Sequence, residues 1–138
     1  MGKAQAAIEF LGIALVGVLL FVPLFFIATD FLGSRSFETA LGQARQTSSA
    51  FASVADSMCL QPQGSKTEAV LAVPSFLDPA TSNITGKTIK FNLTRGDRVE
   101  VVTATSRCDV NGTVPSAAGT YIFEIKREAT LVNITRKV

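Results

Sequence analysis

Glu9 is the residue whose chemistry most needs explaining, because it is an acid at the edge of a long apolar run. The twenty residues that follow it, 10–29, carry no charged side chain. Near the centre of a bilayer a carboxylate costs about 2.5 kcal/mol or more, and less near an interface. In a bundle of staggered helices, Glu9 would pair with the free α-amine of a neighbouring chain. The alternative is an interfacial carboxylate that reaches water or stabilises the start of a helix.

Cys59 and Cys108 are the only cysteines of the sequence. An even number of cysteines in an exported domain favours a disulfide, whereas a metal site would need more ligands. We therefore predict a Cys59–Cys108 disulfide. Closing a loop of this length removes about 4 kcal/mol of unfolded-state entropy.

Four Asn-x-Thr triplets have the pattern of N-glycosylation acceptors, which has meaning only on an exported surface. They begin at Asn83, Asn92, Asn111 and Asn133. Their density favours glycosylation, although Asn and Thr are also common in ordinary turns and strands.

Nothing in the sequence has the pattern of a catalytic site. Histidine is absent, so neither cysteine has an imidazole to activate it. No glycine-rich phosphate loop and no calcium-binding spacing is present. Arg95-Gly96-Asp97 occurs in some adhesion ligands, but it also fits a hairpin turn in which glycine supplies a positive φ. We predict no enzyme activity, no catalytic residue, no cofactor and no metal.

The composition limits the organisation of the chain. Its 138 residues suffice for one domain plus one extended element. A net charge of +2 with 17% charged residues gives no clustered basic surface, so we predict no nucleic-acid partner. The hydrophobic residues are concentrated between positions 10 and 28.

Residues 10–29 are long enough to cross a membrane, which takes about 20 apolar residues. The alternative is a buried core helix, which is disfavoured because the remaining residues are too polar to cover it on every face. A secretory signal would have a shorter apolar stretch and a better cleavage site than residues 25–29 offer. Lys3 precedes the run, while Asp30 and Arg35 follow it, which weakly places the N-terminus in the cytoplasm and the C-terminal part outside.

The helix is expected to continue beyond Asp30, from about Ala6 to about Met58, where Pro62 and Gly64 end it. Spacings of four and three alternate along its second half, as on a helix that lies against a partner surface. The residues of this stripe are Phe37, Leu41, Ala44, Ser48, Phe51, Ala55 and Met58. In the first half, Gly12 and Gly17 permit close helix packing or are merely tolerated, and Pro23 should kink or locally melt the helix.

After Pro62 the periodicity becomes two, which predicts strands over residues 69–73, 89–94, 99–105, 121–126 and 131–135. Short connections indicate an antiparallel sheet. In the second strand Ile89, Phe91 and Leu93 should face the core, with Asn92 on the other face. We predict an α+β fold in which the helical stripe covers one face of this sheet.

The run Lys3-Ala4-Gln5-Ala6-Ala7-Ile8-Glu9, followed directly by the apolar stretch, resembles the class III signal peptide of archaeal pilins in the type IV pilin superfamily. The resemblance implies cleavage by a prepilin peptidase between Ala4 and Gln5, and it gives Glu9 the place of the family's assembly glutamate. The sequence departs from the family at Ala7, where Ser is usual, and at Ile13, where Leu is usual.

The resemblance implies a structural subunit of a surface filament, with adhesion as its expected role. Residues 1–4 would be the leader, 5–29 the transmembrane segment and filament core, 30–58 the amphipathic half of the helix, and 59–138 the extracellular β-domain. The implied partners are other copies of the chain, the peptidase, an assembly ATPase and a membrane platform protein. Before assembly the precursor would sit in the membrane with its N-terminus in the cytoplasm.

Two other functions stay open. One is a permanently anchored minor pilin or extracellular binding protein, which would keep residues 1–4. The other is a soluble binding module delivered by an unusual signal, which would lose everything before about Asp30.

Overall fold

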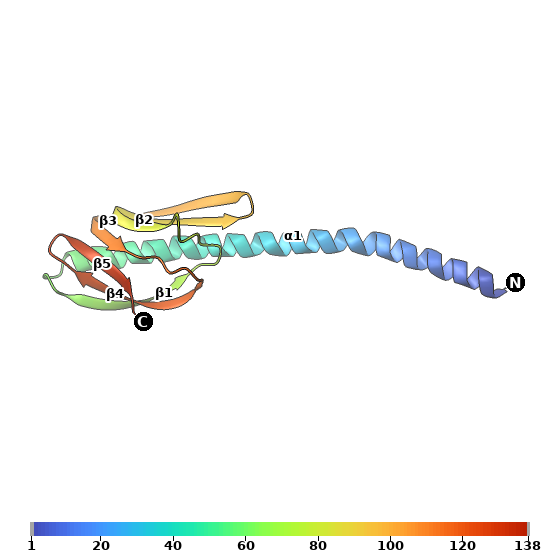
Figure 1. Cartoon of the computed structure of the whole chain (residues 1–138), viewed down its shortest axis with the longest axis horizontal. Coiled ribbons are helices and arrows are strands. Elements are labelled where there is room, and N and C mark those ends of the chain that lie inside the picture. Colours follow the sequence, from blue (N-terminus) through green and yellow to red (C-terminus); the bar gives the residue numbers. More distant parts are fainter. Residues whose placement is uncertain (1, 138) are drawn as a thin grey trace. The chain divides into compact units, whose positions relative to one another are not determined.

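The computed structural model describes residues 2–137, with side chains from Ile8 onward, and has the predicted α+β fold (Figure 1). The chain divides between Ser36 and Phe37 into two compact units, which are described separately. Helix α1, Gly2–Cys59, supplies the helix of the first unit and one layer of the second. Its last turn tightens where Leu60 and Gln61 donate to carbonyls three residues back, and Gly64 then adopts φ 89°.

Pro23 does not interrupt α1, which remains helical on both sides of it. Of the two predicted effects, a kink or local melting, the melting is therefore wrong at this position. A proline removes a single N–H donor, and the neighbouring turns keep their own hydrogen bonds, so a helix can continue through it.

The second unit contains one five-stranded sheet. Its strands are β1 (Lys66–Val73), β2 (Asn83–Arg95), β3 (Arg98–Gly112), β4 (Gly119–Arg127) and β5 (Leu131–Arg136). They lie in the order β1-β4-β5-β3-β2. All five predicted strands are present, and each is longer than predicted, β2 and β3 by the most. Gly96, with φ 57°, opens the β2–β3 turn, as the sequence indicated.

The prediction of a wholly antiparallel sheet is wrong for one pair, because β3 and β5 are parallel. Short connections do reverse the chain at every step, so consecutive strands run in opposite directions. However, β4 crosses to pair with β1, and β5 then returns to lie between β4 and β3. Two strands of the same direction therefore become neighbours.

The second half of α1 lies in the hollow of the curved sheet (Figure 1). Every residue of the predicted stripe is buried, with at most 5% of its surface exposed. Phe51 is central, because its ring packs edge-on against Phe123 at 4.9 Å and against Phe91 at 6.1 Å between centroids. The stripe and the inward residues of the strands form one hydrophobic core.

Both edges of the sheet are partly covered. On β1, the Thr47 hydroxyl donates to the Ala72 carbonyl at 2.6 Å. On β2, residues 74–82 lie along the strand, and the Asp78 amide donates to the Asn92 carbonyl at 2.8 Å. The prediction that Asn92 faces away from the core and outward is therefore incomplete, because this covering segment leaves Asn92 only 7% exposed.

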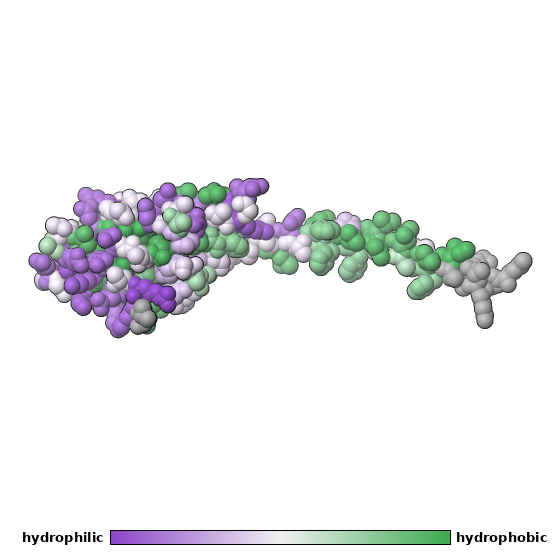
Figure 2. Space-filling view, in the orientation of Figure 1, coloured by the Kyte–Doolittle hydropathy of each residue, from purple (hydrophilic) through white to green (hydrophobic). Residues whose placement is uncertain are grey.

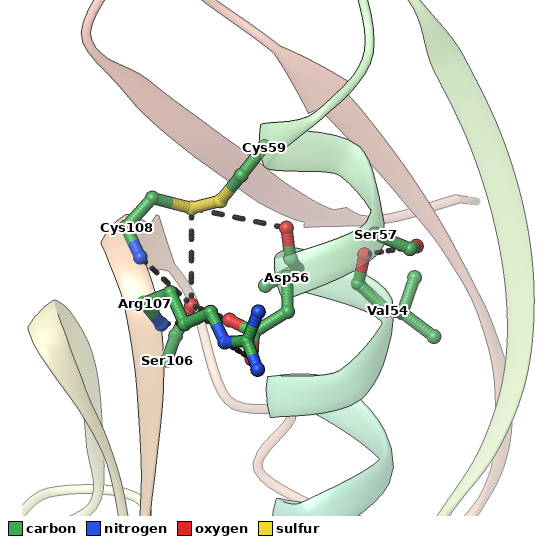
Figure 3. A network of polar contacts seen from close by, with 8 residues as sticks. Val54, Asp56, Ser57, Cys59, Ser106, Arg107 and Cys108 are labelled. Atoms are coloured by element: carbon green, nitrogen blue, oxygen red, sulfur yellow. Dashed lines mark hydrogen bonds and ion pairs between the residues drawn. A yellow bond between two sulfur atoms is a disulfide. The ribbon is translucent and has the colours of Figure 1, made fainter.

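Hydrogen bonds to Asp56 and a disulfide join the C-terminal end of α1 to β3 (Figure 3). The hydrogen bonds between Asp56 and residues 106–107 are called the Asp56 lock below. The Asp56 carboxylate accepts hydrogen bonds from the Arg107 amide at 2.7 Å and the Ser106 hydroxyl at 2.8 Å. These two donors, with the Arg107 amide foremost, hold the pKa of Asp56 below its usual value. One turn later, Cys59 and Cys108 form the predicted disulfide.

Because its folded-state pKa is lowered, Asp56 stabilises the domain at neutral pH, and this contribution is lost as the pH falls through that pKa. We expect Asp56→Asn to lower the free energy of unfolding by about 1 kcal/mol at pH 7, since hydrogen bonds to a charged group are the stronger ones. Urea unfolding followed by circular dichroism, in detergent, measures this difference. It should shrink near pH 3, and the exposed Asp109→Asn on β3 serves as the control. An equal loss at both pH values would contradict the assignment.

The disulfide closes a loop between residues 49 positions apart. We expect the double variant Cys59→Ser, Cys108→Ser to lose about 4 kcal/mol of folding free energy, because its unfolded chain is less constrained. Thermal unfolding with and without a thiol reductant measures the effect. Reductant should destabilise the wild type and leave the variant unchanged, and a wild type that is insensitive to full reduction would refute the expectation.

Candidate membrane and assembly segment

The first unit exposes its apolar side chains on all sides. The large hydrophobic residues from Ile8 to Leu32 are each 48–75% exposed. Figure 2 shows them as the hydrophobic part of the helix. A helix that is apolar all round is stable only where protein or lipid surrounds it. The described chain provides no such cover, so the segment needs a membrane or other chains.

This helix is the one element of the described chain that is long and apolar enough to cross a membrane. None of its most apolar window is buried within the chain, which argues against the helix being the core of a soluble domain. Its length and composition fit a membrane anchor or a signal segment.

The hydroxyl groups at the C-terminal end of the apolar run form hydrogen bonds with main-chain carbonyls of the same helix. The Thr29 hydroxyl donates to the Phe26 carbonyl at 2.9 Å, and the Ser36 hydroxyl donates to the Gly33 carbonyl at 2.7 Å. Such bonds let a hydroxyl sit in an apolar setting without an unpaired donor. The Arg35 guanidinium lies 5.0 Å from the centre of the Phe31 ring, an arrangement suited to a membrane interface.

Small residues leave shallow hollows on this helix. One lies over Gly17 and is bounded by Phe21 and Phe25. A Cβ atom built on Gly12 or on Gly17 meets no atom within 4 Å. No contact among the described residues of this unit requires either glycine, and both positions leave room for close approach by another helix.

Glu9 is exposed beside Gly12, and it makes no hydrogen bond or ion pair with any side chain from Ile8 onward that the structure describes. Ala4 and Gln5 lie in the first turns of α1, but their side chains are outside the described residues. Cleavage before Gln5, and pairing of its amine with Glu9, therefore stay predictions.

The four sequons occupy different environments in the second unit. Asn83 and Asn111 are exposed, Asn133 is half-buried and Asn92 is buried. The periodicity of the strands did not reveal the burial of Asn92, because the covering segment comes from elsewhere in the chain. Sequence reasoning also missed the Asp56 lock, whose partners are about fifty residues away.

Among residues 8–137 no three His, Cys, Asp or Glu side chains gather in a cluster that could hold a metal ion. Comparison with known proteins adds no relative. The chain matches no protein-family model, no curated protein and no solved structure.

Proposed function

We propose that this chain is a structural subunit of a type IV pilin-like surface filament of the archaeal kind, with adhesion as its role. The observation that carries the proposal is the division of one helix between two environments. Residues 8–32 of α1 expose their apolar side chains, whereas its residues from Phe37 onward form the core of a folded domain. A filament of bundled helices would cover the first part and leave the second unchanged.

The hydrophobic effect keeps this segment out of water, at about 25 cal/mol for each Å² of apolar surface that is covered. Membrane lipid covers the segment before assembly, and neighbouring helices cover it afterwards. Because lipid is itself apolar, the choice between the two depends on close packing at small residues and on polar pairing. Gly12 and Gly17 allow the close packing, and Glu9 supplies the polar pairing.

The role of Glu9 follows from its position and from its lack of a partner among the side chains described from Ile8 onward. Its carboxylate stands at the edge of the apolar run and makes no hydrogen bond or ion pair with the side chains that the structure describes from Ile8 onward. After cleavage, the α-amine of Gln5 on a neighbouring chain would be a cation at the same depth in the helix bundle as the Glu9 carboxylate. Pairing the two would fix the stagger between subunits and neutralise a charge that is costly in an apolar bundle.

The second unit supports export of the domain. The Cys59–Cys108 disulfide is characteristic of an oxidising compartment. Export would require the prepilin peptidase, an assembly ATPase and a platform protein, which the resemblance to archaeal pilins implies as partners. The role is structural and requires no enzymatic activity.

The N-terminal residue of the protein sheared from intact cells tests this proposal. Mass spectrometry of the N-terminal peptide should show a start at Gln5. A start at Met1 in the membrane fraction, with nothing released by shearing, would instead indicate a permanently anchored protein. A start near Asp30 would indicate a secreted domain, and either result would refute the filament.

Exchange of Glu9→Gln tests the pairing directly. Cleavage before Gln5 should continue, but the yield of sheared filament should fall about tenfold or more, since breaking a buried ion pair costs about 3–5 kcal/mol. The matched control is Asp30→Asn, which removes an acid at the other end of the apolar run and should leave the yield unchanged. Wild-type yield from Glu9→Gln would exclude the proposed pairing.

A further inference from the structure

We infer that one face of the sheet is a glycan-bearing surface, modified at Asn83, Asn111 and Asn133, and that the fourth sequon asparagine, Asn92, is not modified in the folded domain. The inference rests on the export of the domain in the proposed function. It adds the location of the glycans, which the four triplets alone do not give.

Strand register brings the three asparagines together. In the parallel pair, Asn111 of β3 lies directly opposite Asn133 of β5. In the antiparallel pair on its other side, Asn111 lies opposite Thr85 of β2. Asn83 precedes Thr85 by two residues and therefore points to the same face. Three neighbouring strands, side by side in Figure 1, present the sites at one end of the sheet.

The alternation of the strands suits these triplets. In each, the asparagine and the threonine point away from the core while the middle residue points into it. The middle residues Ile84 and Ile134 are 1% and 0% exposed. The third middle residue is Gly112, where a Cβ atom would lie 2.7 Å from the Ile134 carbonyl oxygen. The acceptor face is therefore opposite to the face that packs on α1.

The acceptor groups are accessible at these sites. Asn83 and Asn111 are exposed, as are the partner threonines Thr85, Thr113 and Thr135. Asn133 is half-buried, and its Nδ2 atom donates a weak hydrogen bond of 3.3 Å to Glu128. Rotation of this side chain would release Nδ2 without disturbing the core, because Val132 and Ile134 carry the packing there.

Asn92 begins the same kind of triplet and lies on β2, as Asn83 does, yet its side chain is enclosed. Its Nδ2 atom donates to the Thr81 carbonyl at 3.0 Å, and its main-chain amide donates to the Ser82 hydroxyl at 2.9 Å. With 7% of its surface exposed, Asn92 leaves no room for a sugar. A glycan there would displace residues 74–82 from the edge of β2. Asn92 is therefore an internal control supplied by the chain itself.

The modification transfers an oligosaccharide from a lipid phosphate carrier. A bond forms between Nδ2 of the asparagine and the anomeric carbon of the first sugar, and Nδ2 loses one proton. The bond between that carbon and the phosphate oxygen of the carrier breaks, and the lipid phosphate leaves with the bonding electron pair, while the proton passes to solvent. No oxidant or reductant is consumed.

A glycan-bearing face cannot also be a tight contact between subunits, because bulky hydrated sugars would be trapped there. In a filament this face would be turned to solvent. The neighbouring outer face of β1 and β4 carries no sequon. It has the ion pair Lys66–Glu124 at 3.4 Å and the adjacent exposed side chains Val70 and Ile122, and it stays available for contacts.

A single tryptic digest of the protein, purified from the cells that naturally make it, tests the inference. Cleavage after Lys and Arg places each sequon asparagine on its own peptide, residues 67–87, 91–95, 108–126 and 128–136. After reduction and alkylation, mass spectrometry should find glycan mass on the first, third and fourth peptides and only the bare mass for 91–95. Comparable modification of 91–95 would overturn the inference.

Variants at Thr113 supply the matched control, because this residue is exposed and lies outside the core. Thr113→Ala should remove the glycan from peptide 108–126, whereas Thr113→Ser should keep it. Loss of glycan from both variants would refute its attachment through the Asn111 sequon.

A parallel digest without reductant separates failure of the glycan inference from failure of the proposed function. Bare peptides from protein that begins at Gln5 and has its cysteines joined would overturn the glycan inference alone. Bare peptides from protein that begins at Met1, with nothing sheared from the cells, would overturn both.

Discussion

The constraint on which this structure depends is that about twenty-five residues of helix cannot remain exposed to water. The large apolar side chains from Ile8 to Leu32 are at least 48% exposed, and nothing in the described chain is available to cover them. Wherever the protein keeps this segment, lipid or other protein must surround it. The core of the folded domain is complete without this segment, so assembly or membrane insertion can cover the segment while the domain keeps its own packing.

Stability of the domain rests on the end of α1 that the sheet encloses. Phe51 packs on rings from β2 and β4, while Asp56 and Cys59 bind β3. These contacts join the helix to both halves of the sheet, whose neighbouring strands are far apart in sequence. A domain of this size gains from such links, because a small core leaves a narrow margin of stability.

Periodic features of this fold could be read from the sequence, and contacts between distant residues could not. The helical stripe and the strands repeat every three to four or every two residues, so local spacing revealed them. The parallel β3–β5 pair, the Asp56 lock and the cover over Asn92 each bring together residues that no short window contains. The predicted roles of Gln5 and Glu9 are a different case, because their partner would be another chain.

Asn92 shows why a motif and a site are different things. Its triplet is as good a sequence match as the triplet at Asn111, and both asparagines point away from the helix-facing side of their strands. The difference arises from residues 74–82, which bond to the open edge of β2 and enclose Asn92. No comparable segment covers β3 at Asn111, where β2 and β5 flank the strand within the sheet. The same protection that keeps an edge strand from pairing with other chains thereby decides which asparagine is accessible for modification.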